Sequence, residues 1–223
     1  MNRDLIRAVT LKSVVLYPPT VRLERGKLTQ LYSTICDYKP YAQFAFQPDG
    51  AQMFNDPNTM LRLGPDRLSF QERIPHNQSS YSTVRDYERI VDDFWKAFQP
   101  GVFITQEVVI EALWPLENGG DAVEMIESRF LRFGREDALR LGAECAGVGL
   151  KLVFPRFAPS KAVELRVEPF FRDSKQLFLA VSSQDLQPVQ APAAVGERVR
   201  WVEHLLGHEV ADFVARHASR SQS

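Results

Sequence analysis

Two histidines spaced four residues apart, His204 and His208, form the most chemically specific pattern in the sequence. On a helix this spacing places both imidazoles on one face, where together they can bind a transition metal such as zinc or nickel. The zincin pattern has a glutamate directly after its first histidine, whereas Leu205 follows His204 here. The apolar positions of the segment, among them Val199 and Val202, recur on the opposite side of the helix. The pattern therefore predicts a solvent-exposed histidine pair, with a weak metal site as the alternative, and no cofactor is expected.

Residues able to act as covalent nucleophiles are present, but the sequence offers them no partners. It contains no G-x-S-x-G motif, and His76 stands in a turn-like stretch rather than after a core strand. Cys36 and Cys145 occupy positions whose periodicity directs both thiols toward apolar stripes, and buried thiols are commonly inert. These observations favour a protein that is not an enzyme.

Charged side chains on predicted strands are the candidates for a ligand site. They alternate with apolar residues, as in the segment 163–168, so the charges of one strand share a face. If that face is concave, five of them can converge into a polar pocket: Glu111, Arg140, Glu144, Glu164 and Arg166. The alternative is a solvated sheet face that carries cross-strand ion pairs.

Two tryptophans are candidates for a contact surface. Trp114 stands at the end of a predicted strand, and Trp201 flanks the apolar stripe of the last predicted helix. Exposed tryptophans are enriched at protein interfaces. The two residues therefore predict an interface with a protein partner or with a second copy of the chain.

The elements that must position these residues follow from the hydrophobic periodicity. The first half predicts a strand over 5–17 and a helix over 26–38, then three strands and a closing helix over 84–98. The last two of the three strands flank Gly64-Pro65-Asp66, which has the turn chemistry of a β-hairpin.

The same order returns in the second half, from a strand over 102–114 to a last helix that ends near residue 216. We therefore predict an α+β fold of two tandem βαβββα repeats in a ferredoxin-like, split-βαβ layout, with antiparallel sheets covered by helices on one face. The expected boundaries are 1–100 and 101–217, followed by a disordered tail over 218–223. The alternative is one continuous curved sheet shared by both halves. No flexible linker separates the halves near Pro100, so they are expected to form one cooperative unit.

Composition restricts the class of partner. The formal net charge of −1 argues against nucleic acid, which binds proteins with a basic excess. No apolar run approaches the roughly 18–20 residues of a membrane span, and no signal peptide is recognisable, so a cytoplasmic protein without a membrane partner is expected. Two widely separated cysteines fit reduced thiols rather than a disulfide framework.

The segment from Leu61 to Leu116, with its L-G-P-D hairpin and a helix led by Tyr81 and Tyr87, resembles a known family. That family is a sporadically distributed group of uncharacterised bacterial proteins of about this length. The resemblance implies a bacterial source and the same order of elements. It implies no activity, cofactor or catalytic residue.

Together these patterns favour a non-enzymatic protein that acts through protein–protein contacts or self-assembly. The alternative class is a small-ligand-binding protein or an enzyme that uses the polar sheet face. Nucleic-acid binding would require a contiguous basic face around Arg129 to Arg140. If the chain has a site, we expect it at the seam between the two halves or on the sheet face that they share.

Overall fold

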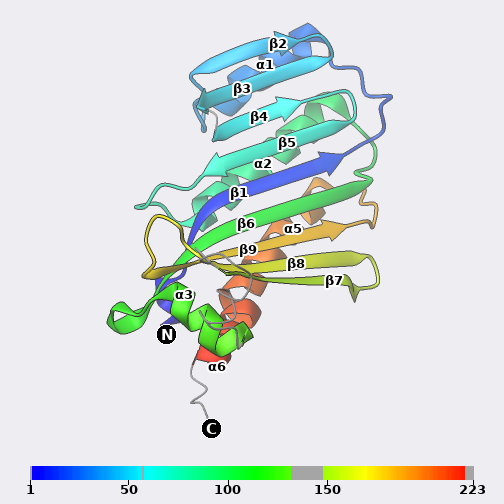
Figure 1. The fold of residues 1–223 in the computed structure, drawn as a ribbon. Helices are drawn as coiled ribbons and strands as arrows, with labels where there is room; N and C mark the ends of the chain where they lie inside the picture. The colour runs from blue at the N-terminus through cyan, green and yellow to red at the C-terminus, as the bar shows by residue number, and fades with distance from the viewer. Residues whose placement is uncertain (1, 57, 132–147, 219–223) are drawn as a thin grey trace.

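The computed structural model describes residues 2–56, 58–131 and 148–218. Its centre is a single nine-stranded sheet with the strand order β2-β3-β4-β5-β1-β6-β9-β8-β7 (Figure 1). The strands are β1 Arg7–Leu16, β2 Gln43–Gln47, β3 Gly50–Asp56, β4 Thr59–Leu63, β5 Arg67–Arg73, β6 Thr105–Pro115, β7 Leu150–Ala158, β8 Lys161–Pro169 and β9 Gln176–Asp185. Every pairing between these neighbours is antiparallel.

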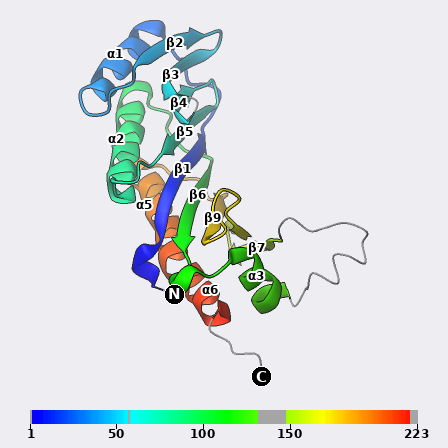
Figure 2. The same cartoon turned by 60° about the vertical axis from the view of Figure 1, so that its left-hand side comes forward.

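The helices are α1 Arg25–Cys36, α2 Ser80–Phe98, the short α3 Ala122–Met125, α5 Pro192–Leu205 and α6 Ala211–Ala218. Helices α1, α2 and α5 lie against one face of the sheet, and α3 lies beside β7 (Figure 2). A π-helical segment, Leu206–Val210, joins α5 to α6. Within the described part of the chain, no helix is long and apolar enough to cross a lipid bilayer.

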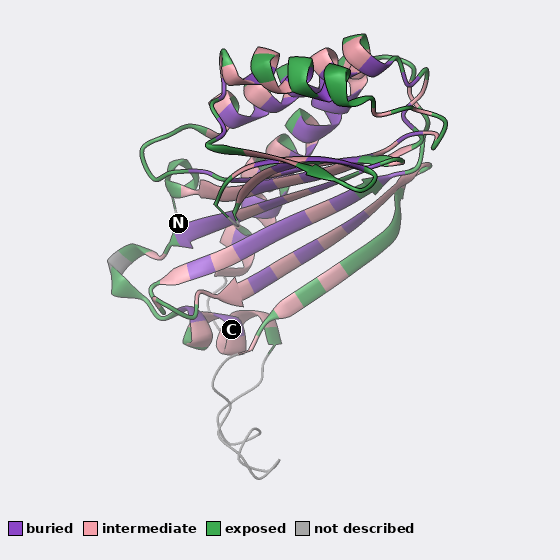
Figure 3. Ribbon diagram, turned by 90° about the horizontal axis from the view of Figure 1, so that it is seen from above, coloured by how far each residue is buried: buried purple, intermediate pink, exposed green. Residues whose placement is uncertain are grey.

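The core lies between the sheet and the helices. Buried and less buried residues alternate along the strands, because successive side chains point to opposite faces (Figure 3). On β1, Leu11 and Val15 are almost completely buried toward the helices, whereas Lys12 and Val14 are only half-buried. Helix α2 contributes an apolar stripe that includes Tyr87 and Phe94. Among the described residues, no helical layer covers the opposite face of the sheet, which is called the open face below.

The prediction of two tandem ferredoxin-like repeats is wrong. The strands of both halves form one sheet, because β1 pairs directly with β6 from Arg7↔Leu113 to Leu16↔Thr105. A split-βαβ layout also needs parallel neighbours, whereas all pairings here are antiparallel, and four strands rather than three follow α1. The physical reason is the edge of each half: pairing the long first strands satisfies backbone groups that two separate sheets would leave open.

The predicted hairpin at Gly64-Pro65-Asp66 is confirmed, since β4 and β5 pair up to Leu63↔Leu68. Tyr17, at the end of β1, donates a hydrogen bond from its hydroxyl to the carbonyl oxygen of Gly64. This contact fixes the turn against the neighbouring strand. Burial raises the pKa of Tyr17 above its usual range, so the hydroxyl stays a donor.

Candidate binding groove

A groove of about 820 Å³ lies on the open face where the first strands of the two halves meet. Its floor is formed by β1, β5, β6 and β9, and its rim by three connections: the β3–β4 turn, the loop after β5 and the β8–β9 turn. All three connections lie at the same end of the sheet (Figure 1). We call it the seam groove, defined by Arg7, Thr10, Lys12, Arg73, Glu111, Leu113, Phe171, Arg172 and Phe178 with their neighbours.

Strand parity directs the floor residues away from the helices. Ser13 contacts Tyr87 of α2, so its neighbour Lys12 points to the open face. On β6, Gln106 contacts the Val195 carbonyl of α5, so Glu111, five residues further along, also points to the open face. The two charged side chains therefore share the floor of the groove.

A register shift in β1 aligns the groove. Between Ala8 and Thr10 the pairing with β6 slips by one residue, as in a β-bulge. Bulges re-aim side chains and are common beside functional sites. After the shift, Thr10 stands directly opposite Glu111 on one side and Arg73 on the other. The bulge thus brings a basic and an acidic side chain to either side of a small residue.

The cations of the groove outnumber its carboxylates. The Nζ atom of Lys12 lies 2.8 Å from Oε1 of Glu111, and this ion pair neutralises both groups. The side chains of Arg7 and Arg73 form no ion pair with any residue in the described ranges. Arg172, at the rim, holds its guanidinium 5.2 Å from the centre of the Phe171 ring.

The end of the groove near the β8–β9 turn is apolar. Phe171 is 84% exposed, the largest exposure among the exposed large hydrophobic residues that the structure describes. Its ring lies 5.5 Å from that of Phe170 in an edge-on arrangement. Phe178 and Leu113, paired neighbours on β9 and β6, continue this surface onto the floor. An exposed aromatic ring beside an arginine is typical of interfaces.

Only one of the five residues predicted to form a polar pocket lines this groove, namely Glu111. Glu164 and Arg166 lie on the same open face, two strands away on β8. There they form a surface ladder in which Lys151 Nζ lies 2.8 Å from Glu164 Oε2, and Arg166 lies 3.9 Å from Glu164. Arg140 and Glu144 lie outside the described residues, as does Cys145.

The two histidines lie side by side, His204 in the last turn of α5 and His208 in the π-helical segment that follows it. The rings of His204 and His208 are 4.2 Å apart between centroids, and both residues are exposed. Nε2 of His204 is 3.6 Å from Oε1 of Glu209. Among the described residues, no group of three or more histidine, cysteine, aspartate or glutamate side chains is placed to hold a metal ion.

The two candidate interface tryptophans have different environments. Trp114 is completely buried, and its Nε1 donates a 3.0 Å hydrogen bond to the carbonyl oxygen of Asn2, so the exposure expected for it is wrong. Trp201 is half-buried on α5 and packs edge-on against Phe157 at 5.8 Å. Nζ of Lys161 lies 4.1 Å from the centre of its ring. Trp201 therefore remains at the surface of an aromatic cluster next to β7.

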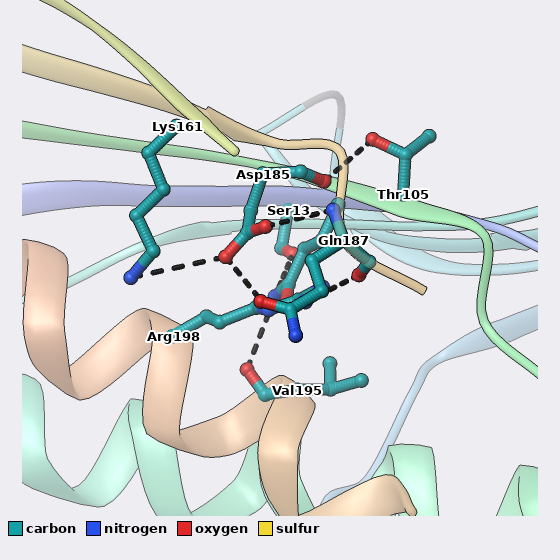
Figure 4. Close-up of polar contacts among 8 residues, drawn as sticks. Ser13, Thr105, Lys161, Asp185, Gln187, Val195 and Arg198 are labelled. Atoms are coloured by element: carbon teal, nitrogen blue, oxygen red, sulfur yellow. Dashed lines mark hydrogen bonds and ion pairs between the residues drawn. The ribbon is translucent and has the colours of Figure 1, made fainter. Parts of the chain in front are cut away.

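A buried polar network on the helix side has no counterpart in the sequence prediction (Figure 4). Asp185, at the end of β9, forms an ion pair with Arg198, whose Nε lies 3.1 Å from its Oδ2. The same Oδ2 lies 3.8 Å from Lys161 Nζ. Arg198 also donates to the carbonyl oxygen of Gln187 at 2.5 Å. Only 9% of Arg198 is exposed, and this burial lowers the pKa of its guanidinium. The network joins α5 to the sheet.

A second group of the same network lies under the seam. Gln106 donates to the Ser13 hydroxyl at 3.2 Å and to the Val195 carbonyl at 3.1 Å. The hydroxyls of Ser13 and Tyr87 are 2.8 Å apart. Burial raises the pKa of Tyr87, so this tyrosine stays protonated. The sequence signal that could have predicted this group was the presence of polar residues, Ser13 and Gln106, at inward-facing positions of predicted strands.

Sequence reasoning also missed the arginines of the seam groove. Arg7, Arg73 and Arg172 come from two strands and a turn that are far apart in the chain. No local spacing relates them, so only the strand order brings them together. A scan against protein-family models and a search of curated proteins both found no match to this sequence.

Proposed function

We propose that this chain is a non-enzymatic protein that acts by binding a protein partner in the seam groove. The observation that carries the proposal is a combination in one open groove: Arg7 and Arg73, which form no ion pair with a described residue, and the exposed ring of Phe171. Arginine and aromatic residues dominate the energetics of protein interfaces. An exposed phenylalanine gains free energy when a partner removes it from water.

The lining of the groove supports binding rather than catalysis. Among the described residues, the lining includes no serine or cysteine, and His76 is the histidine that it contains. His76 forms no hydrogen bond or ion pair with a described residue, so no carboxylate orients it as a general base. An open floor of strand residues also leaves water free to enter, which weakens electrostatic catalysis.

A photo-crosslinking amino acid at position 171 tests the proposal in source cells, with the same amino acid at position 81 as a control. Tyr81 is 65% exposed and lies on α2, in the helical layer. The protein crosslinked at 171 alone would be identified by mass spectrometry, produced in pure form and titrated against this chain by calorimetry. We expect saturable binding that Arg73→Glu abolishes. Binding that is unchanged by Arg73→Glu contradicts the proposal.

A second candidate function is self-assembly, which the aromatic cluster beside β7 favours. This edge strand carries three exposed apolar residues, Val153, Phe154 and Phe157, at 58%, 41% and 45% exposure. The same strand contains Pro155 and the cations Lys151 and Arg156, which protect sheet edges against pairing. Light scattering coupled to size exclusion decides the question: a dimer that Phe157→Ser dissociates supports self-assembly, whereas a monomer at high concentration excludes it.

The proposal includes a cytoplasmic location. It is supported by the free thiol of Cys36, since free thiols persist in reducing compartments. Fractionation of source cells with an antibody against the chain tests this location. Recovery in an exported fraction contradicts it.

A further inference from the structure

We infer that the segment bound in the seam groove is an extended acidic peptide carrying at least one aromatic or large aliphatic side chain. This inference rests on the proposed function, because it names the chemistry of the partner for the same groove. Its basis is the charge, the spacing and the apolar end of the groove.

The charge of the groove selects an anionic partner. Lys12 and Glu111 neutralise each other at 2.8 Å, which leaves Arg7, Arg73 and Arg172 to be balanced. The remaining carboxylate of the lining, Asp56, accepts a hydrogen bond from the backbone N–H of Asn58 at 2.6 Å. On a chain whose formal net charge is −1, this is a local excess of positive charge. Guanidinium groups bind carboxylates in a planar, two-pronged geometry.

The spacing of the arginines selects an extended ligand. Arg73 stands opposite Thr10, three positions along β1 from Arg7. At the usual rise of a strand, the Cα atoms of Arg7 and Thr10 are roughly 7–10 Å apart. Arg73 lies on the neighbouring strand β5, about 5 Å across the sheet from Thr10, so the Cα atoms of Arg7 and Arg73 are roughly 8–11 Å apart. Two carboxylates two residues apart on an extended peptide, about 7 Å from each other, can each reach one of these two long side chains.

The apolar end of the groove selects the third element of the peptide. Phe171 is 84% exposed, and Leu113 and Phe178 continue its surface onto the floor. Arg172 lies over the Phe171 ring at 5.2 Å and presents a cation at the boundary between the apolar and charged parts. A peptide with a large apolar side chain next to an acidic residue can therefore place the apolar side chain against Phe171 and the carboxylate against Arg172.

A carboxylate of the lining, Asp56, argues against a nucleic acid in the same groove. It stands near the cations with no ion pair to a described residue, and a continuous phosphate backbone would bring negative charge against it. A peptide can place a neutral or apolar residue at this position. Nucleic-acid binding is consequently an alternative outcome of the test.

Fluorescence anisotropy with four labelled probes tests the inference on the full chain. The probes are an alternating glutamate–phenylalanine peptide, the same peptide with glutamine or with lysine in place of glutamate, and a single-stranded DNA oligonucleotide. The test variant is Arg73→Gln combined with Arg172→Gln. Its matched control is Arg62→Gln, an exposed arginine on the open face outside the groove.

We expect the acidic peptide to bind most tightly, with an affinity that falls as salt rises. The double variant should lose about tenfold in affinity, and Arg62→Gln should lose none. Equal binding of the glutamine peptide overturns the inference while leaving the proposed groove intact. Tighter binding of DNA than of the acidic peptide also overturns it. If no probe binds the wild-type chain, the inference fails, and the crosslink at position 171 decides separately whether the groove binds a protein.

Discussion

Nζ of Lys12 on β1 and Oε1 of Glu111 on β6 lie 2.8 Å apart, across the strand pair that joins the two halves of the chain. Both side chains face the open side of the sheet, with 38% and 18% of their side-chain surface exposed. The pair removes one cation from the seam groove. Substitution of Glu111 measures two effects of this ion pair: its contribution to the unfolding free energy and its effect on the charge of the groove.

Glu111→Gln should raise the affinity of the seam groove for the acidic peptide, because it releases the charge of Lys12. We expect about a threefold to fivefold gain, with a change in unfolding free energy below about 1 kcal/mol, the size typical of a partly exposed pair. Glu164→Gln on the same face is the matched control and should leave the affinity unchanged. Anisotropy titration measures both, and an unchanged or lower affinity for Glu111→Gln contradicts the prediction.

Arg198→Met should destabilise the fold strongly. It leaves the carboxylate of Asp185, itself only 5% exposed, without its 3.1 Å ion pair and with Lys161 at 3.8 Å as the remaining cation. Breaking a buried pair costs up to about 3–5 kcal/mol, and Lys161 offsets part of this cost. Arg200→Met, two residues along the same helix, removes a half-exposed arginine that pairs with Glu88 and should cost less than about 1 kcal/mol. Urea unfolding compares the two variants. Equal losses would show that the buried network does not hold α5 to the sheet.

Glu72 should make stability fall as pH rises above the usual titration range of glutamate. Burial raises the pKa of Glu72, with Asp86 and Asp56 adding to the rise and Lys39 opposing it. A raised pKa means that the folded chain holds the proton more tightly than the unfolded chain. The contribution of Glu72 is therefore fully present below its unfolded pKa of about 4.3 and is lost as pH rises through the folded value.

Urea unfolding of wild type and Glu72→Gln across pH 4 to 7, a range of about three units around and above that value, measures this effect. The wild-type unfolding free energy should decline relative to that of the variant as pH rises. Asp66→Asn is the control of opposite sign, because a hydrogen bond from Arg67 lowers the pKa of Asp66 and its contribution is lost as pH falls. A difference for Glu72→Gln that is constant or grows with pH refutes the prediction.

Gly50→Ala should destabilise the β3–β4 pair. A Cβ atom at position 50 would stand 1.8 Å from the carbonyl oxygen of Leu63, so the backbone must shift at a cost of about 1–3 kcal/mol. Gly26→Ala is the matched control in α1, where a Cβ atom meets nothing within 4 Å. That change should stabilise by about 0.5–1 kcal/mol, because alanine is the better helix former. Denaturant midpoints of the two variants should move in opposite directions.

Local elements were readable from the sequence because their signals are local. The turn residues Gly64-Pro65-Asp66 specify a hairpin between adjoining strands, and the apolar stripe over 84–98 specifies α2, which spans Ser80–Phe98. The exposed placement of His204 and His208 followed from the position of the apolar stripe on their helix. Alternation along β6 and β8 likewise put Glu111, Glu164 and Arg166 on one face.

The strand order was decided only by the tertiary structure. Periodicity tells which face of a strand is buried, and it carries no information about which strand lies beside it. The pairing of β1 with β6 joins residues about a hundred positions apart and merges two expected sheets into one. The same pairing creates the seam groove, whose arginines have no common sequence signal.

Side-chain environments at strand ends were also beyond the sequence. Trp114, at the end of β6, is covered by the N-terminal residues through its hydrogen bond to Asn2. Ser13 and Gln106 are polar residues in the core, accepted there because they bond to each other and to Tyr87 and Val195. The sequence by itself determined most of the local elements and the faces of their strands, but not the fourth strand that follows α1. Long-range backbone pairing decided the rest, because hydrogen bonds between distant strands set which faces become continuous.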